Sequence, residues 1–433
     1  MSIKNPHFEA NRYEGQLQQA YFVGSKGEVL NIIENFVSCN LFEDIFSDSV
    51  SGNMLLKDEK NAIKAQELNG DDKLVIVLNY KDELTALEFL VYSHSYTRLT
   101  DNSELVNLNF ISLPSVLSQN ARVWGAYKGG IDSIVKQVYD GVVKDYTPTK
   151  INNYAPVAKM PQIECDTTEG IVKIVGTGKT PFETIAWLSG RATEVETSGS
   201  MFLFYQTIFE GYKFKCLEKL AKEGTQNALE ESHVFYYGYA GTGYERQNLH
   251  EFKIHTLADT LKTSKELYTD LWLTDFTNKT ILKRTFDANT SSQPLLNSRV
   301  LGFMDNKNGF NFDFESLRKS GNLRSMIKNE SSQVHNGIDF KTGNSLQRKY
   351  SMLRQMNAMS VSFEAFSNHA VKVGDVVELF IPQKRGVNKN SDTSETLTDK
   401  EISGKYIVAA KRIEFEMEKV KMQVQCIKDS ALE

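Results

Sequence analysis

The chain has 433 residues, of which 40% are hydrophobic and 24% are charged, with a formal net charge of −5. At roughly 100–200 residues per domain this length predicts about two to four domains, and the composition is that of a folded protein. The mild negative charge excludes the broad basic surface that tight binding to nucleic acid requires.

The N-terminal sequence MSIKNPHFEANRYEG lacks the charged segment followed by an apolar segment that marks a secretory leader. No apolar run approaches the ~18 residues of a membrane-spanning helix. We therefore expect a soluble cytosolic product without membrane insertion. The cysteines Cys39, Cys165, Cys216 and Cys426 have no metal-binding or disulfide spacing, so we expect buried reduced thiols.

Residues 28–113 have the pattern of short β-strands. Apolar runs such as DKLVIVLNY, LEFLVYSHSYTRLT and SELVNLNFIS are separated by turn residues, among them Gly70, Asp71, Asp101 and Asn102. Strands that recur about every ten residues predict a small antiparallel barrel or sandwich.

A helical period follows in YKGGIDSIVKQVYDGVVKDY. Its apolar residues at helical spacing are Ile131, Ile134, Val135, Val138 and Val142. A second helix is predicted in KTPFETIAWLSGRATE, with Thr180 as N-cap, Pro181 as the first helical residue and Glu183 completing a capping box. These helices form an α-containing segment between β-rich parts of the chain.

Strands return in MFLFYQTIFEGYKFKCLEKL, with a turn at Glu210 and Gly211. Residues 267–287 predict a hairpin, whereas the polar stretch 318–345 predicts a loop. Further on, Gly374 and Asp375 predict a tight turn before a strand over Val376–Ile381 that Pro382 ends. Residues 384–401 are almost devoid of apolar side chains and predict a mobile loop, and Gly404 begins the next strand.

The last strands, in RIEFEMEKVKMQVQCIKD (412–429), alternate between apolar and polar residues. One face carries Ile413, Phe415, Met417, Val420, Met422, Val424 and Cys426. The other face carries Glu414, Glu416, Lys421, Gln423 and Gln425. This period of two predicts an antiparallel hairpin that is buried on one face, while the other face meets water or a wet partner.

Three stretches resemble catalytic motifs but have the wrong spacing. GTGKT (176–180) has Lys173 where a phosphate-binding loop needs glycine, and it is better explained as a helix start. In HEFKIH, His250 and His255 are five residues apart rather than four, which favours ordinary packed or surface histidines. GYAGTGYER (238–246) does not match a dinucleotide loop. No catalytic, cofactor-binding or metal-binding residue is predicted, and no cofactor.

Three groups of segments together carry a family resemblance. Near the C-terminus VGDVVELFIP is followed by SGKYIV and RIEFE, and near the N-terminus stands NLFEDIFSDSVSGNMLLKDEKN. The middle segments are RVWGAYKGGIDSIVKQV, TPFETIAWLSGRA and FLFYQTIFEGYKFKCLEKL. In this order they resemble the central baseplate hub protein of contractile-tailed bacteriophages, a family related to the base of type VI secretion spike proteins.

The resemblance implies a mainly β, multidomain fold with two similar tube-type antiparallel β-barrel domains and smaller α-containing domains. We expect an N-terminal arm (1–20), a first barrel (21–118), an α-containing domain (119–200) and a mixed α+β segment with strands of the second barrel (201–350). The remaining strands of the second barrel then occupy 351–433, around the loop 384–401.

It also implies a non-enzymatic homotrimer whose six barrels form a pseudo-sixfold ring in the virion tail, assembled in the host cytoplasm. Its expected partners are the central spike, the tail tube or tube-initiator protein and the baseplate wedges. DNA would pass through the channel without specific binding, because a near-neutral wall offers little counterion-release attraction.

Two alternatives stay open. A tail-associated cell-wall-degrading or carbohydrate-binding protein could use the aromatic residues (11%) to stack on sugars, although no pair of catalytic carboxylates can be identified. The base of a secretion spike is the other alternative, in which case the needle would be a separate chain.

Overall fold

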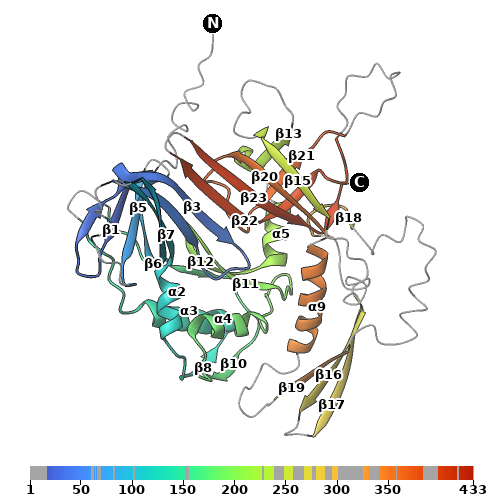
Figure 1. The fold of residues 1–433 in the computed structure, drawn as a ribbon. Helices are drawn as coiled ribbons and strands as arrows, with labels where there is room; N and C mark the ends of the chain where they lie inside the picture. The colour runs from blue at the N-terminus through green and yellow to red at the C-terminus, as the bar shows by residue number, and fades with distance from the viewer. Residues whose placement is uncertain are drawn as a thin grey trace, which may run out of the picture.

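The computed structural model of the chain describes the following residues: 17–59, 63, 65, 70–80, 83–100, 103–151, 156–226, 229–237, 248–256, 268–275, 279–287, 295–300, 325–330, 341–356, 358–383, 398–416 and 419–432. Its fold is mainly β, with few helices, and it is organised in several sheets around separate cores (Figure 1). The fold class predicted from the sequence is thereby confirmed.

The N-terminal β-lobe contains seven strands, ordered β2-β1-β5-β6-β7-β4-β3 and antiparallel throughout. Their bounds are β1 (Leu17–Val23), β2 (Val29–Asn31), β3 (Phe36–Asp44), β4 (Ser51–Asp58), β5 (Lys73–Tyr80), β6 (Glu83–Thr100) and β7 (Ser103–Ser112). Inward residues such as Met54, Leu108 and Phe110 pack into one hydrophobic cluster. The predicted succession of short strands is confirmed.

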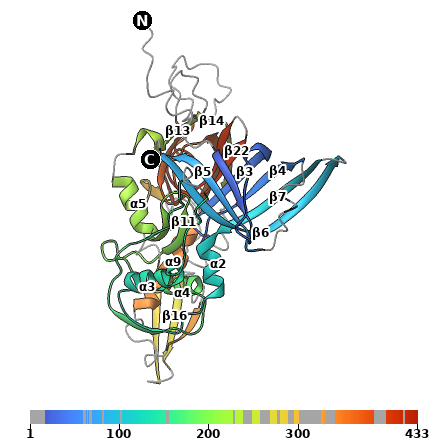
Figure 2. The same cartoon turned by 90° about the vertical axis from the view of Figure 1, so that its left-hand side faces the viewer.

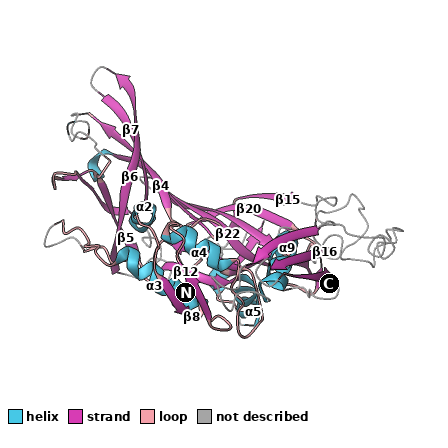
Figure 3. Cartoon of the chain, turned by 90° about the horizontal axis from the view of Figure 1, so that it is seen from below, coloured by secondary structure: helices cyan, strands magenta, loops and turns pink. Residues whose placement is uncertain are grey.

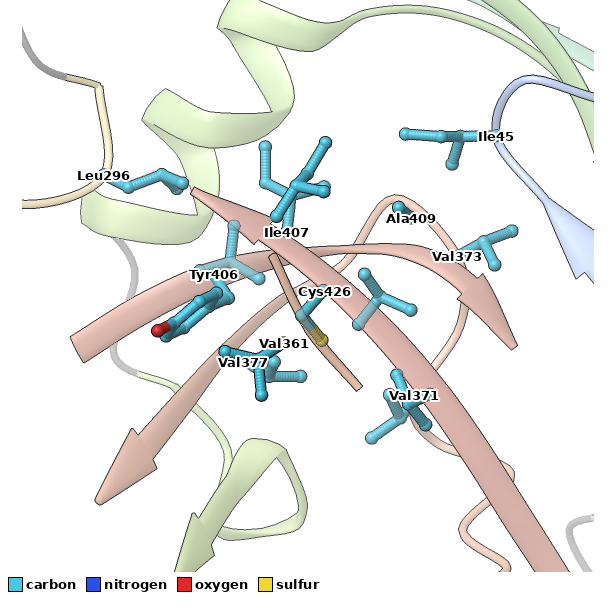
Figure 4. Close-up of a cluster of buried hydrophobic side chains, with 14 of the residues drawn as sticks. Ile45, Leu296, Val361, Val371, Val373, Val377, Tyr406, Ile407, Ala409 and Cys426 are labelled. Atoms are coloured by element: carbon cyan, nitrogen blue, oxygen red, sulfur yellow. The ribbon is translucent and has the colours of Figure 1, made fainter. Parts of the chain in front are cut away.

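The C-terminal β-lobe contains β13 (Val234–Tyr237), β14 (Asn248–Leu249), β15 (Glu251–Thr256), β20 (Met359–Phe366), β21 (Val376–Phe380), β22 (Gly404–Glu416) and β23 (Val420–Lys428). Its core gathers Val361, Tyr406, Ile407 and Cys426 with residues distant in sequence, including Ile45 and Leu296 (Figure 4). The second half of β22 pairs with β3, so the two lobes share one continuous sheet.

The two lobes repeat a unit of five strands in the same chain order. In the N-terminal lobe β3 pairs β4, β4 pairs β7, β7 pairs β6 and β6 pairs β5. In the C-terminal lobe the same pairings join β15, β20, β23, β22 and β21. Each strand of the first unit therefore has a counterpart in the second: β3 corresponds to β15, β4 to β20, β5 to β21, β6 to β22 and β7 to β23.

A smaller unit with helices lies against both lobes. It contains α2 (Leu113–Asn120), β8 (Ala126–Gly129), α3 (Ile131–Val143), β9 (Ile163–Cys165), β10 (Val172–Val175), α4 (Pro181–Ser189), β11 (Phe202–Thr207), β12 (Gly211–Cys216) and α5 (Leu217–Gln226). Strand β11 is buried along its whole length. Leu203 and Tyr205 enter the C-terminal core, Phe202 and Phe204 enter the core of the helical unit, and Ile208 beyond the strand reaches the N-terminal core.

The remaining elements lie between β15 and β20 in the chain and at its end. They are β16 (Tyr268–Asp275), β17 (Thr280–Asp287), β18 (Arg299–Val300), β19 (Ser325–Glu330), α9 (Lys341–Met356) and β24 (Ser430–Ala431). Strands β16, β17 and β19 form a small sheet beside α9 (Figure 2). Met352 and Met356 of α9 belong to the C-terminal core.

Several local predictions are confirmed. Helix α4 starts at Pro181, and Thr180 and Glu183 form the predicted capping box. Strands β16 and β17 pair antiparallel, as the hairpin predicted over residues 267–287 requires. Gly374 has a φ of +92° at the predicted turn, and β22 begins at Gly404.

The loop prediction for residues 318–345 is wrong in part. Residues 325–330 form β19, which pairs in parallel with β16, and α9 begins at Lys341. Both segments are polar, so their structure depends on neighbours rather than on a strong apolar period of their own.

The segments 1–16, 238–247, 384–397 and 417–418, which include Met417, lie outside the described residues. The division into domains stays a proposal; β9, β11 and β12 form one sheet across position 200.

Candidate functional surface

One face of the shared sheet is polar across eight neighbouring strands. In order these are β15, β20, β23, β22, β3, β4, β7 and the outer part of β6, four from each lobe (Figure 3). The register places these side chains on the face: Glu251, Lys253, His255, Ser362, Glu364, Lys421, Gln423, Gln425, Arg412, Glu414, Asn40, Ser51, Asn53, Asn107, Asn109, Ser93, Ser95 and Thr97. Apolar side chains on the same face include Phe42, Leu55 and Leu105.

The alternation within each strand creates this surface. In β7, Asn107 and Asn109 alternate with the buried Val106, Leu108 and Phe110. In the hairpin of β22 and β23, Ile413 and Met422 face the cores while Arg412 and Gln423 face outward, as the sequence predicted. Because successive residues of a strand point to opposite sides, both cores lie behind the sheet and the polar face lies in front of it.

Hydrogen bonds connect the polar side chains across the junction of the lobes. Asn40 Nδ2 donates to Asn53 Oδ1 (2.7 Å), and Arg412 Nε donates to Asn40 Oδ1 (3.0 Å). Arg412 and Asn40 are 372 residues apart in the sequence. On the C-terminal side Arg412 Nη1 reaches Gln423 Oε1 at 3.4 Å, and Gln423 Nε2 reaches Glu364 Oε2 at 3.4 Å.

Charges on the face are balanced. Arg412 pairs with Glu414 (2.8 Å) and Lys421 pairs with Glu364 (3.1 Å). Partial burial raises the pKa of Glu364, but hydrogen bonds from Lys421 and Gln423 outweigh it and leave that pKa below its usual value. The register also places Lys57, Lys253, Asp44, Glu251 and Glu416 on this side, so charges of the two signs nearly cancel over the face.

Behind the junction lies a buried pair of opposite charges. Glu43 of β3 and Lys411 of β22 are opposite each other in register, and both are 3% exposed. Lys411 Nζ donates to the carbonyl oxygens of Asn368 (2.9 Å) and Val371 (2.5 Å), and Glu43 Oε1 accepts the Ile208 amide (2.5 Å). Burial raises the pKa of Glu43, against the opposing effect of Lys411, and burial also lowers the pKa of Lys411. The pair joins the two lobes and the helical unit.

A cavity of about 380 Å³ lies between β5, β6, the start of α2 and the turn of β11 and β12. Beside it, Glu88 accepts hydrogen bonds from Tyr146 and from Thr149 (2.7 Å to Oγ1) and pairs with Lys73 at 2.9 Å. Glu210, also at the wall, pairs with Lys213 (3.0 Å) and Lys372. These carboxylates connect segments of the fold to one another.

Two of the motif-like stretches, GTGKT and HEFKIH, lie within the described residues and make ordinary structural contacts. GTGKT precedes α4 as its capping segment. His250 stacks edge-on against Phe366, with 4.7 Å between ring centroids, and His255 Nε2 lies 2.7 Å from Ser362 Oγ, so the two histidines have separate, ordinary contacts. All four cysteines are free thiols, and Cys39, Cys216 and Cys426 are buried, while Cys165 is half-buried.

Within the described part of the chain, no group of three or more His, Cys, Asp or Glu side chains could hold a metal ion. Nor is any helix there both long and apolar enough to span a membrane.

The sequence predicts only part of the polar face. The sequence predicts the hairpin at its centre, but it does not distinguish Asn40, Asn53, Asn107 and Asn109 as members of one surface, although VNLNF alternates with a period of two.

Comparison with known proteins finds similarity in structure alone. No family model matches the chain, and no curated protein matches it in sequence. The tail protein from Neisseria meningitidis has a TM-score of 0.51 at 8% identity, and the match covers 95% of this chain and 96% of that one. This match shows a common fold over nearly the whole of both chains.

Two other solved structures are similar at lower scores. The 43 kDa tail protein of prophage MuSo2 from Shewanella oneidensis has a TM-score of 0.49 at 8% identity, covering 95% of this chain and 98% of that chain. An Escherichia coli component of the type VI secretion system has a TM-score of 0.42 at 7% identity, covering 91% and 73%.

Proposed function

We propose that this protein is a non-enzymatic structural component of a phage-type tail, the central hub of the baseplate. Three copies, each with two equivalent five-strand units, form a pseudo-sixfold ring that joins the hexameric tail tube and the wedges to a trimeric central spike. The ring belongs to the virion tail, and DNA passes through its channel.

The observation that carries this proposal is the continuous polar face across both lobes. It is contributed by four strands of each repeat unit, and both hydrophobic cores lie behind it. Such a one-sided sheet needs water or a wet surface in front of it. The lumen of a ring meets that need, and the repeat supplies two similar wall segments from each chain.

The chemistry of the face agrees with a channel for DNA. Its amide and hydroxyl side chains carry no charge. Its cations Lys57, Lys253, Arg412 and Lys421 are offset by the acidic residues Asp44, Glu251, Glu364, Glu414 and Glu416. Retention of DNA rises with each phosphate that a cation neutralises, because counterions are released. A balanced wall therefore lets a polyanion slide. The fold shared with a tail protein supports the same assignment.

The experiment that tests the proposal is the mass of the purified protein by light scattering over a dilution series, followed by electron microscopy. We expect a species of three times 49.0 kDa and an annulus with sixfold-like projections. A monomer at every concentration, or a closed dimer, would contradict the ring.

A further inference from the structure

Strands β8 and β10 form a two-stranded antiparallel ribbon on the outside of the helical unit. A backbone hydrogen bond from Gly176 N to the Gly125 carbonyl oxygen (2.7 Å) extends the ladder beyond the strands. The inward side chains Val172 and Ile174 belong to the core of the helical unit. Figure 1 shows α3 and α4 between this ribbon and the large sheet, so the second face of the ribbon is directed away from the rest of the chain.

The outward face of the ribbon exposes apolar and basic side chains together. Alternation places five large side chains on this face: Trp124, Lys128, Ile171, Lys173 and Val175. Trp124 is 72% exposed, Ile171 69% and Val175 45%. Lys128 and Lys173 lie directly opposite each other in the register, and neither has an ion-pair partner among the described residues.

The glycines of the GTGKT stretch hold Trp124 in position. Gly178 has a φ of +76°, and a Cβ at this residue would lie 2.4 Å from the indole ring. A Cβ at Gly176 would lie 2.5 Å from the Val123 carbonyl oxygen, so this glycine lets the two segments approach each other. The indole therefore lies directly against the backbone of Gly178 while most of it stays open to solvent. A side chain that is ordered before binding loses little conformational freedom when a partner arrives.

The composition of this face is unfavourable for a surface that meets only water. Like charges directly opposite on neighbouring strands destabilise a sheet, and Lys128 and Lys173 are such a pair. Single exposed apolar side chains are ordinary, but here three of them share one face with two unpaired cations. Protein interfaces combine an apolar centre, often with a tryptophan, and a polar rim. A partner that covered the apolar groups and supplied carboxylates would relieve both features.

We propose that the outward face of the β8–β10 ribbon binds an acidic segment of another protein, in which apolar side chains lie beside the carboxylates. The apolar side chains pack on Trp124, Ile171 and Val175, and the carboxylates pair with Lys128 and Lys173. Charge complementarity selects this partner, because β8 and β10 contain two lysines and no acidic residue. The ribbon lies outside the polar face of the large sheet, so the inference goes beyond the proposed ring and does not depend on it.

Two other classes of partner match the face less well. Duplex DNA presents phosphates on its outside, and two lysines neutralise too few of them for stable binding. Anionic membranes are recognised through clusters of about four to eight basic residues, whereas the ribbon has two. An acidic protein segment with apolar side chains matches both the basic and the apolar groups.

Fluorescence anisotropy with a labelled peptide tests the proposal. The probe is a short peptide in which glutamates flank a phenylalanine and two leucines, and a second peptide has lysine in place of every glutamate. We expect the full-length protein to bind the acidic peptide in low salt and not to bind the basic one. Lys128→Glu with Lys173→Glu should weaken binding at least about tenfold, and so should Trp124→Ala.

Matched controls separate the ribbon from general charge and from misfolding. Lys144→Glu with Lys222→Glu makes the same change of net charge at exposed lysines outside the ribbon and should leave binding unchanged. Reversal of both ribbon lysines keeps a like-charge pair, so we expect that variant to fold as the parent does, which circular dichroism measures. A third peptide, with serine in place of its apolar residues, should bind at least about tenfold more weakly than the acidic probe.

The possible results differ in what they mean. Binding of the acidic peptide that requires both the ribbon lysines and Trp124 supports the proposal. Absence of binding to the parent, or equal binding by the charge-reversed variant, overturns it. Trp124-dependent binding of phosphatidylglycerol vesicles or of a DNA duplex, without binding of the peptide, overturns it in favour of that partner. Because the readout does not depend on oligomeric state, each of these results leaves the ring proposal to its own test.

Discussion

At the scale of single residues, the most unusual feature is the buried pair Glu43 and Lys411. Removing a carboxylate and an ammonium from water is costly, and the cost is offset only when both groups have partners. Lys411 has two carbonyl acceptors, and Glu43 Oε1 has the Ile208 amide, while Oε2 has no hydrogen-bond partner among the described residues. No Glu43–Lys411 contact of ion-pair length is present among the described residues, so the two groups attract each other over a longer distance where three structural units meet.

Lys411→Met should lower the free energy of unfolding by about 3 kcal/mol, because it leaves the Glu43 carboxylate buried without a cation. The double variant Glu43→Gln with Lys411→Met should recover part of the loss. Chemical denaturation of the three proteins measures the difference. Equal stability of the single variant and the parent would show that the pair contributes nothing to the junction.

Glu88 gives a prediction for pH dependence. Burial raises the pKa of Glu88, but hydrogen bonds from Thr149, Tyr146 and Lys73 outweigh burial and lower it. An acid whose pKa is lower in the folded state stabilises the fold above its unfolded pKa of about 4.3, and this stabilisation is lost as pH falls toward the folded pKa.

The stability difference between the parent and Glu88→Gln should therefore shrink as pH is lowered below about 4.3. Urea unfolding at a series of pH values measures it, with Glu83→Gln, at an exposed site on the same strand, as the control. A difference that is constant with pH would argue against a role for the charge of Glu88.

At the scale of elements, close packing between neighbouring strands limits the size of the side chains that fit in the five-strand unit. Gly52 in β4 lies opposite Leu41 of β3 and Phe110 of β7. A Cβ there would lie 2.4 Å from the Asn40 carbonyl oxygen and 2.5 Å from the Phe110 ring. The glycine thus lets the Phe110 ring lie across β4 within the N-terminal core.

Gly52→Ala should destabilise the protein by about 2 kcal/mol, because overpacking forces the strand or the ring to move. Gly141→Ala is the matched control: this helical glycine of α3 has nothing within 4 Å of an added Cβ. Alanine there should stabilise by about 0.5–1 kcal/mol. Thermal unfolding compares the two; a neutral Gly52→Ala would mean that the core accommodates the methyl group.

Elements also differ in how far the sequence predicts them. The start of α4 was predicted to the residue, because a capping box is a local pattern of Thr180, Pro181 and Glu183. The sequence does not predict helix α9, because KTGNSLQRKYSMLRQM is polar and its buried apolar side chains, Met352 and Met356, belong to the core of a distant lobe. The pairing of β19 with β16 likewise depends on a neighbour about 50 residues away rather than on its own composition.

At the scale of the whole molecule, the neutral polar face is the property on which the proposed channel depends. Three substitutions, Asn53→Lys, Asn107→Lys and Asn109→Lys, add positive charge to adjacent strands of this face. We expect the variant to bind linear duplex DNA at least about tenfold more tightly than the parent in low salt, with a steep loss of binding as salt rises.

Fluorescence anisotropy with labelled DNA measures this change. The matched control adds three lysines elsewhere, at the exposed positions Val157, Ile171 and Val195. If the control binds DNA as tightly as the face variant, the effect comes from net charge, and the face has no special access to DNA.

Local patterns in the sequence already specify part of this structure. Alternation in VNLNF and in RIEFEM determined which side chains of a strand share a face, and turn residues such as Gly374 determined where strands begin. Which strand faces merge into one surface depends on long-range contacts. The contact of β22 with β3 joins residues more than 360 positions apart, and no local period encodes such a neighbour. The continuous polar face and the buried Glu43–Lys411 pair both follow from that one pairing.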